Sequence, residues 1–159
     1  MPHSDILYES IIKIKKLLSN KEITALELTK LSLERIEETN KKTNAFLYVA
    51  ETEALEAAKK IDKKIANGED TGLLGGIPTS IKDLEAVKGM PQTNGSLFYK
   101  DNIADFDQLG IVRIRNAGGI ILGKTNTPEF GLCATTDNRL GDDCKNPWDL
   151  TCTSGGSSG

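Results

Sequence analysis

The stretch DQLGIVRIRNAGGIIL, residues 107–122, decides the fold class of this chain. Residues 107–117 predict a short helix, and Gly118 fits the position just after a helix end, where glycine is common. The apolar run of residues 120–122 then predicts a buried strand. A helix followed directly by a buried strand is typical of the crossover connection in a parallel or mixed sheet. We therefore expect an α/β core.

Upstream of this unit the pattern is mostly helical. The predicted elements are a helix over residues 4–19 capped by Ser4, a helix from the Thr24–Glu27 capping box, a strand over residues 45–50, a helix through residues 55–65 that ends at Asn67 and Gly68, and a strand near residues 79–81. We accordingly divide the chain into an N-terminal helical layer, residues 1–70, and the first part of an α/β core, residues 71–159.

Composition narrows the class of protein. The chain has 159 residues, 38% of them hydrophobic and 27% charged, which suits one globular domain. A net charge of -3 gives no basic field for nucleic acid. No apolar run approaches the roughly 20 residues of a membrane span. The N-terminus lacks the features of a signal peptide, so we expect a cytoplasmic protein without membrane contact.

The histidine and cysteine content restricts the chemistry. The only histidine is His3, in the expected N-terminal tail, so a Ser-His-Asp or Cys-His site is not expected. Cys133, Cys144 and Cys152 form no Cys-x-x-Cys pair, which makes a zinc site improbable and reduced thiols the expectation. Any hydrolytic chemistry must use another base.

Two features could supply such chemistry, and each has an ordinary interpretation as well. Lys82 follows the predicted strand; it is either a solvated lysine or a desolvated general base. Residues 155–159, GGSSG, can bring backbone close to a substrate and expose hydroxyls, but they equally resemble a flexible linker. They lack the Gly-Lys-Ser/Thr ending of a phosphate-binding loop. Thr79 stands where a β-lactamase-like Ser-x-x-Lys motif needs serine.

Taken together, ordered blocks along the chain resemble the amidase-signature family. The blocks are residues 75–83 (GGIPTSIKD), 118–130 (GGIILGKTNTPEF), 146–149 (NPWD) and 155–159 (GGSSG). Lys82 and Ser157 are 75 positions apart, the spacing expected in that family. Ser154, where the family usually has proline, is a departure. The resemblance covers most of the chain.

The resemblance implies a fold and a mechanism. The fold would be a mixed sheet flanked by helices on both faces, behind a helical N-terminal layer and incomplete here. Lys82 would be the general base. Ser157, after a cis peptide bond, would relay the proton from a nucleophilic serine in a Ser-cisSer-Lys triad. In the family that nucleophile lies further along, beyond Gly159, so we expect the isolated chain to be inactive.

The resemblance also suggests roles for neighbouring residues. Gly131 and Cys133 fall in the segment that borders the acyl pocket of the family, although ordinary loop packing explains each equally well. Gly155, Gly156, Ser158 and Gly159 would shape the serine loop. No metal or cofactor is implied.

Three functions stay open on sequence grounds. The first is a stand-alone amidase acting on a small or aryl-acyl linear amide. The second is the A subunit of the Glu-tRNA(Gln) amidotransferase, which works with partner subunits. The third is a short, non-catalytic binding module. The expected partner is a small-molecule amide, and the full-length protein could form homo-oligomers or join the other amidotransferase subunits.

Overall fold

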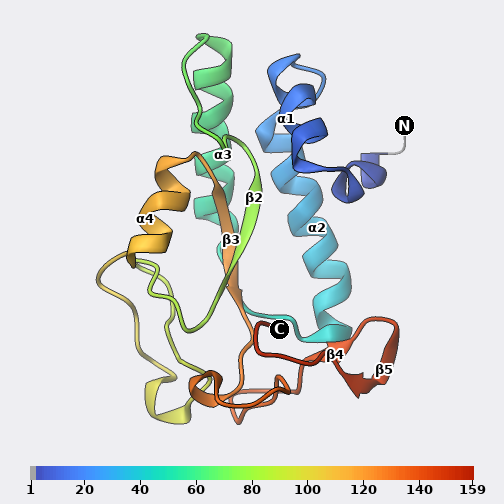
Figure 1. The fold of residues 1–159 in the computed structure, drawn as a ribbon, viewed down its shortest axis with the longest axis vertical. Coiled ribbons are helices and arrows are strands. Elements are labelled where there is room, and N and C mark those ends of the chain that lie inside the picture. Colours follow the sequence, from blue (N-terminus) through green and yellow to red (C-terminus); the bar gives the residue numbers. More distant parts are fainter. Residues whose placement is uncertain (1–2) are drawn as a thin grey trace.

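A three-stranded mixed sheet runs through the middle of the molecule in the computed structural model, which describes residues 3–159 (Figure 1). Strand β3 (Ile120–Thr125) lies between β1 (Phe46–Val49) and β2 (Pro78–Lys82). β3 is antiparallel to β1 and parallel to β2. Helix α4 (Leu109–Asn116) lies between the two parallel strands in sequence, so the crossover unit predicted from residues 107–122 is confirmed.

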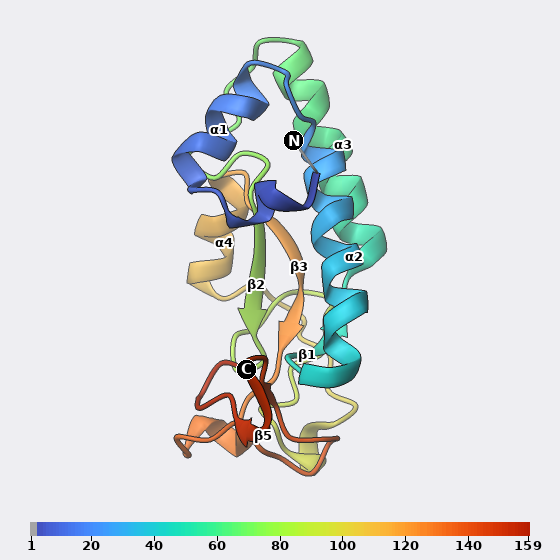
Figure 2. The ribbon, with the colours of Figure 1, turned by 90° about the vertical axis from the view of Figure 1, so that its right-hand side faces the viewer.

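Helices cover both faces of this sheet, as Figure 2 shows in a view along its edge. Ile120 and Leu122 of β3 pack in one buried cluster with α1 (Ile11–Ser19), α2 (Ala25–Thr43) and α3 (Glu51–Ala66). Ile121 points to the other face, where it joins a second cluster with Ile111 of α4. Because both faces of β3 are covered, its apolar run of residues 120–122 is buried on both sides. The predicted α/β class with helices on both faces is confirmed.

In the N-terminal layer, the helix predicted from the Thr24–Glu27 capping box is observed, but the helix predicted before it is not. The capping box predicted for α2 is present: Thr24 accepts a hydrogen bond from the Glu27 N–H, and the Glu27 side chain accepts one from the Thr24 N–H. The single helix predicted over residues 4–19 is wrong. A 3-10 helix (His3–Tyr8) precedes α1, because the side chain of Ser10 accepts a hydrogen bond from the Lys13 N–H and starts a new helix there. The side chain of Ser4 lies outside the described residues.

The carboxyl ends of β2 and β3 point toward a layer of loops at one end of the molecule (Figures 1 and 2). This layer holds short 3-10 helices at Leu97–Tyr99 and Glu129–Gly131 and a hairpin made of β4 (Lys145–Asn146) and β5 (Asp149–Thr153). No helix or strand was predicted for these residues from the sequence. Residues 149–153 (DLTCT) alternate polar and apolar side chains, as a strand can, although all five are exposed.

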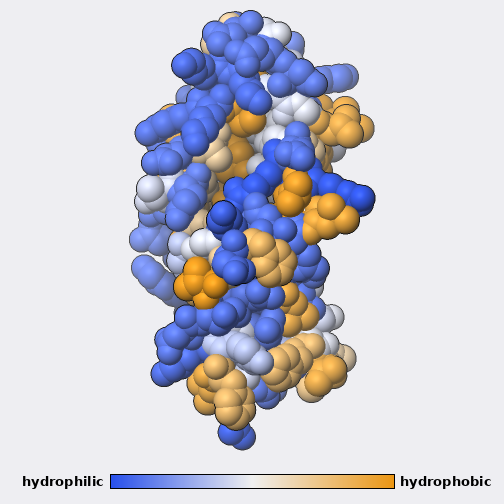
Figure 3. Space-filling model, turned by 90° about the vertical axis from the view of Figure 1, so that its left-hand side faces the viewer, coloured by the Kyte–Doolittle hydropathy of each residue, from blue (hydrophilic) through white to orange (hydrophobic). Residues whose placement is uncertain are grey.

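Large apolar side chains remain exposed beside α4 and on the loop layer. They include Phe98 (93% exposed), Leu109 (63%), Leu132 (81%) and Trp148 (95%). Figure 3 shows groups of apolar residues along this side of the molecule and at its lower end. None of the helices within residues 3–159 is long and apolar enough to cross a membrane.

Candidate active site

Lys82 is the last residue of β2, and its backbone is held on both sides. It lies opposite Thr125 of β3, and the next residue donates its N–H to the Thr125 carbonyl at 3.2 Å. The Lys82 carbonyl accepts the Glu85 N–H at 3.0 Å. The side chain is half-buried and extends from the carboxyl end of the strand into the loop layer. In open α/β sheets this end is where ligands commonly bind.

Ser157 lies on the loop that follows β5, and that loop reaches back to Lys82. Lys82 Nζ and Ser157 Oγ are 2.5 Å apart, although the residues are 75 positions apart in sequence. The Gly156–Ser157 peptide bond is cis. The hydroxyl of the buried Thr136 donates to the Gly155 carbonyl at 2.8 Å and so anchors the loop.

The glycines of the serine loop allow close backbone packing. A Cβ added at Gly156 would lie only 2.9 Å from the Ala134 carbonyl oxygen, and one at Gly159 would lie 2.8 Å from the Ala45 carbonyl oxygen. Gly155 has a φ of +80°, which favours glycine. Ser158 is exposed, and within the described residues its hydroxyl has no hydrogen-bond partner. The support expected from Ser158 comes instead from Thr136.

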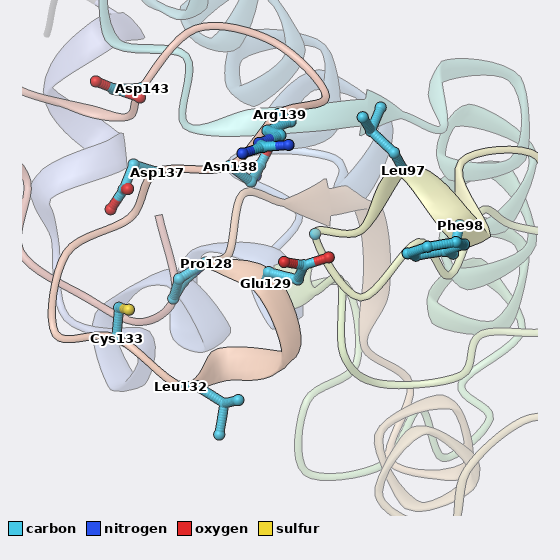
Figure 4. Close-up of a pocket in the computed structure, with 11 residues that line it drawn as sticks. Leu97, Phe98, Pro128, Glu129, Leu132, Cys133, Asp137, Asn138, Arg139 and Asp143 are labelled. Carbon is cyan, nitrogen blue, oxygen red and sulfur yellow. The ribbon is translucent and has the colours of Figure 1, made fainter.

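Gly131 and Cys133 have different surroundings in the structure: Gly131 lies beside Lys82, and Cys133 lines a cavity on the loop layer. A Cβ added at Gly131 would lie 2.7 Å from Leu84 Cδ1 and 3.7 Å from Lys82 Nζ, so glycine lets the chain pack closely against Leu84 beside the amine. Cys133 is exposed and lines a cavity of about 600 Å³ on the loop layer. In Figure 4 Cys133 and Asp137 lie on one side of this cavity and Leu97 and Phe98 on the other.

The sequence reasoning missed a buried charge pair directly behind Lys82. Lys124 of β3 has a fully buried side chain, and its Nζ lies 3.3 Å from Oδ1 of the buried Asp83. Burial lowers the pKa of the Lys124 ammonium below its ordinary value of 10.5, and the nearby charge of Asp83 opposes part of this shift. The predicted strand ended at Leu122, because Gly123 and Lys124 interrupt the apolar run, so the sequence did not place Lys124 inside the sheet.

Metal and disulfide chemistry find no support in the described part of the chain. Within residues 3–159, no group of three or more His, Cys, Asp or Glu side chains is arranged to hold a metal ion. Cys144 is buried, Cys152 is exposed, and both are free thiols, as is Cys133.

The geometry supports proton transfer between an amine and a hydroxyl. With Lys82 protonated, its Nζ donates to Ser157 Oγ; with Lys82 neutral, the same contact lets the serine hydroxyl donate to the amine. A hydroxyl in that position can in turn accept a proton from a further group. The pair can therefore act as a base with a one-residue relay.

Comparisons with known proteins point to one family. A family model described as Amidase matches residues 27–159. The chain is 44% identical over 147 residues to the A subunit of a glutamyl-tRNA(Gln) amidotransferase from Clostridium botulinum, covering 92% of this chain and 30% of that protein. The corresponding amidotransferase protein of Acidothermus cellulolyticus is 38% identical over 156 residues, covering 98% and 31%.

Solved structures give the same result. A bacterial aryl acylamidase of the amidase-signature enzymes superposes with a TM-score of 0.89 at 33% identity, covering 94% of this chain and 31% of the acylamidase chain. This chain therefore spans about 30% of the length of the curated relatives it matches.

Proposed function

The chain belongs to the amidase-signature family, and on that premise we propose that it supplies the base and the proton relay of an amide-hydrolysing site. Lys82 is the general base and Ser157 the bridging serine. The observation that carries the proposal is the 2.5 Å contact between Lys82 Nζ and Ser157 Oγ. Two residues so distant in sequence meet here because β2 and the serine loop end at the same edge of the sheet.

In this mechanism neutral Lys82 takes the proton of Ser157 while Ser157 takes the proton of an attacking serine. The attacking oxygen adds to the amide carbonyl, and the proton returns to the leaving amine through the same relay. Water then hydrolyses the acyl-enzyme ester.

The attacking serine is not supplied by residues 1–159 in this proposal. Ser158 adjoins Ser157 but is exposed, and within the described residues its hydroxyl contacts neither Ser157 nor Lys82. We therefore expect the 159-residue chain to leave amides unhydrolysed by itself. The substrate class that we propose is a small or aryl-acyl linear amide.

A chimera tests the proposal. Residues 1–159 replace the matching segment of the bacterial aryl acylamidase, and hydrolysis of para-nitroacetanilide is followed by absorbance. We expect an active chimera in which Lys82→Ala and Ser157→Ala each lower kcat by about a hundredfold or more. Lys88→Ala and Ser80→Ala, which alter an exposed lysine and an exposed serine, are the matched controls. An active chimera that tolerates Lys82→Ala would refute the assignment.

The second candidate is the amidotransferase function, and the 44% identity to the Clostridium botulinum protein favours it. The same chemistry would then release ammonia from glutamine. The discriminating experiment exchanges residues 1–159 into that Clostridium botulinum protein and measures glutaminase activity with and without its partner subunits. Activity that requires the partners supports the amidotransferase branch, whereas hydrolysis of the anilide by the other chimera supports the stand-alone amidase.

A further inference from the structure

The loop that leaves Lys82 is tied together by one buried ammonium group. Lys124 Nζ donates to the Glu85 carbonyl at 2.7 Å and to the Pro91 carbonyl at 3.0 Å. Its third contact is the ion pair with Asp83 at 3.3 Å. An ammonium has three donors. Its two hydrogen bonds and its ion pair are therefore all made with the segment of residues 83–91, which begins directly after the lysine of the site.

Asp83 continues this network on its other carboxylate oxygen. Oδ2 accepts the Thr93 N–H at 3.0 Å and also the Thr93 hydroxyl. The backbone of Asp83 is also hydrogen-bonded on both sides. Its N–H donates to the Thr125 carbonyl, and its carbonyl accepts the Asn94 N–H at 3.3 Å. Both ends of the loop are therefore fixed to the residue that follows Lys82.

Stability alone is a poor explanation for such a pair. Desolvating two opposite charges costs about as much as their attraction returns, and apolar replacements of buried ion pairs are often neutral or stabilising. The pair also has a specific place. Successive strand residues point to opposite faces, so Asp83 faces Lys124 behind the sheet while Lys82 faces Ser157 in front of it.

We propose that Lys124 and Asp83 are positioning residues for Lys82, because their buried ion pair fixes the loop of residues 83–94 and thereby holds the Lys82 amine against Ser157. Neither residue touches the substrate or takes part in proton transfer. The inference rests on the proposed role of Lys82, but its test needs no turnover, so the two can fail separately.

The test measures the reactivity of individual lysines in the 159-residue chain. Brief acetylation with acetic anhydride under native conditions, followed by peptide mass spectrometry, gives the labelling of Lys82 relative to the exposed Lys100. Ser157→Ala calibrates the probe, since it removes the partner of the amine. We expect Lys124→Met to raise relative labelling of Lys82 by roughly three- to tenfold, the range for loss of one hydrogen bond.

Arg115→Met is the matched control. Arg115 pairs with Asp107 at 3.0 Å, and Asp107 accepts the Lys88 N–H at 2.8 Å, so this pair also holds the loop but on the side away from Lys82. Lys82 labelling should not change in this variant. If Lys124→Met fails to fold, the double variant Asp83→Asn/Lys124→Met, which carries no buried charge, replaces it and should show the same rise.

Two results would overturn the inference. One is unchanged labelling of Lys82 in the folded Lys124 variants, while Ser157→Ala raises that labelling. The other is no change in any of these variants, because the amine would then make no contact with Ser157 in solution. A loss of amidase activity in the Lys82→Ala chimera together with either result would leave the proposed function intact and remove only the positioning role.

Discussion

Two lysines on adjacent strands of the same sheet have opposite surroundings. Lys82 ends β2, half-buried, with a serine hydroxyl as its neighbour. Lys124 lies inside β3, fully buried, with a carboxylate and two carbonyl groups around it. The first has a partner with which it can exchange a proton. The second has partners that hold its charge in place.

The buried lysine makes stability depend on pH in a direction that can be predicted. Burial lowers the pKa of Lys124 while the charges of Asp83 and Glu85 oppose the shift, so between the lowered pKa and 10.5 the folded chain binds fewer protons than the unfolded chain. The free energy of unfolding contributed by this group therefore rises with pH across that window. Below the lowered pKa its contribution is constant.

We predict that Lys124→Met lowers the free energy of unfolding by about 3–5 kcal/mol, because Asp83 stays buried without its partner. The deficit should grow as pH is raised toward 10.5, with a slope of at most about 1.4 kcal/mol per pH unit. Urea denaturation of both proteins at several alkaline pH values measures it. A deficit that shrinks over this range would contradict the assignment, and Arg115→Met provides the reference with a constant deficit.

For single residues, the sequence identified the pair of Lys82 and Ser157 but not the buried ion pair of Lys124 and Asp83 behind it. Lys82 and Ser157 could be paired because their motifs and spacing match those of a family. Lys124 could not be placed, because Gly123 and Lys124 interrupt the apolar run and the predicted strand stopped at Leu122. The strand continues because Gly123 lets the chain pass close to β1: a Cβ there would lie 2.1 Å from the Tyr48 carbonyl oxygen.

Among the elements, the serine loop depends on a segment with no regular structure. The backbone of residues 134–135 packs against Gly156, and the Thr136 hydroxyl donates to the Gly155 carbonyl. The β4–β5 hairpin then brings the chain to this point, with the Ser154 N–H donating to the Cys144 carbonyl at 3.1 Å. Such contacts between loops have no periodicity, so the sequence predicted the motif of the loop but not what holds it.

We predict that Thr136→Val loosens the serine loop while leaving the rest of the fold in place. Valine keeps the shape of threonine but cannot donate to the Gly155 carbonyl, so the buried side of the loop loses a hydrogen bond of about 1 kcal/mol. Hydrogen exchange followed by mass spectrometry should show faster exchange in residues 154–159. Thr135→Val, at the exposed neighbouring position, is the control. Equal exchange in the two variants would mean that Thr136 does not anchor the loop.

For the whole molecule, the distribution of apolar residues distinguishes the core from the surface. The two clusters on either side of the sheet bury small and branched aliphatic residues. By contrast, aromatic and leucine side chains remain exposed beside α4 and on the loop layer. Large exposed apolar areas are uncommon on monomeric proteins and usually mark a contact surface. The relatives are about three times as long as this chain. Additional sequence in a longer protein, or another chain, could therefore cover these exposed residues.

We therefore predict that the folded 159-residue chain binds the fluorescent dye anilinonaphthalene sulfonate through this surface. The double variant Phe98→Ser/Leu109→Lys should bind less dye yet keep its free energy of unfolding within about 0.5 kcal/mol, because both side chains are mostly exposed. Leu73→Lys, which alters an exposed leucine in the turn before β2, should leave dye binding unchanged. Leu28→Ala provides the opposite case: it removes a buried side chain of α2 and should cost about 2–5 kcal/mol. If the double variant lowered the free energy of unfolding as much as Leu28→Ala, these apolar residues would belong to the core rather than to an exposed contact surface.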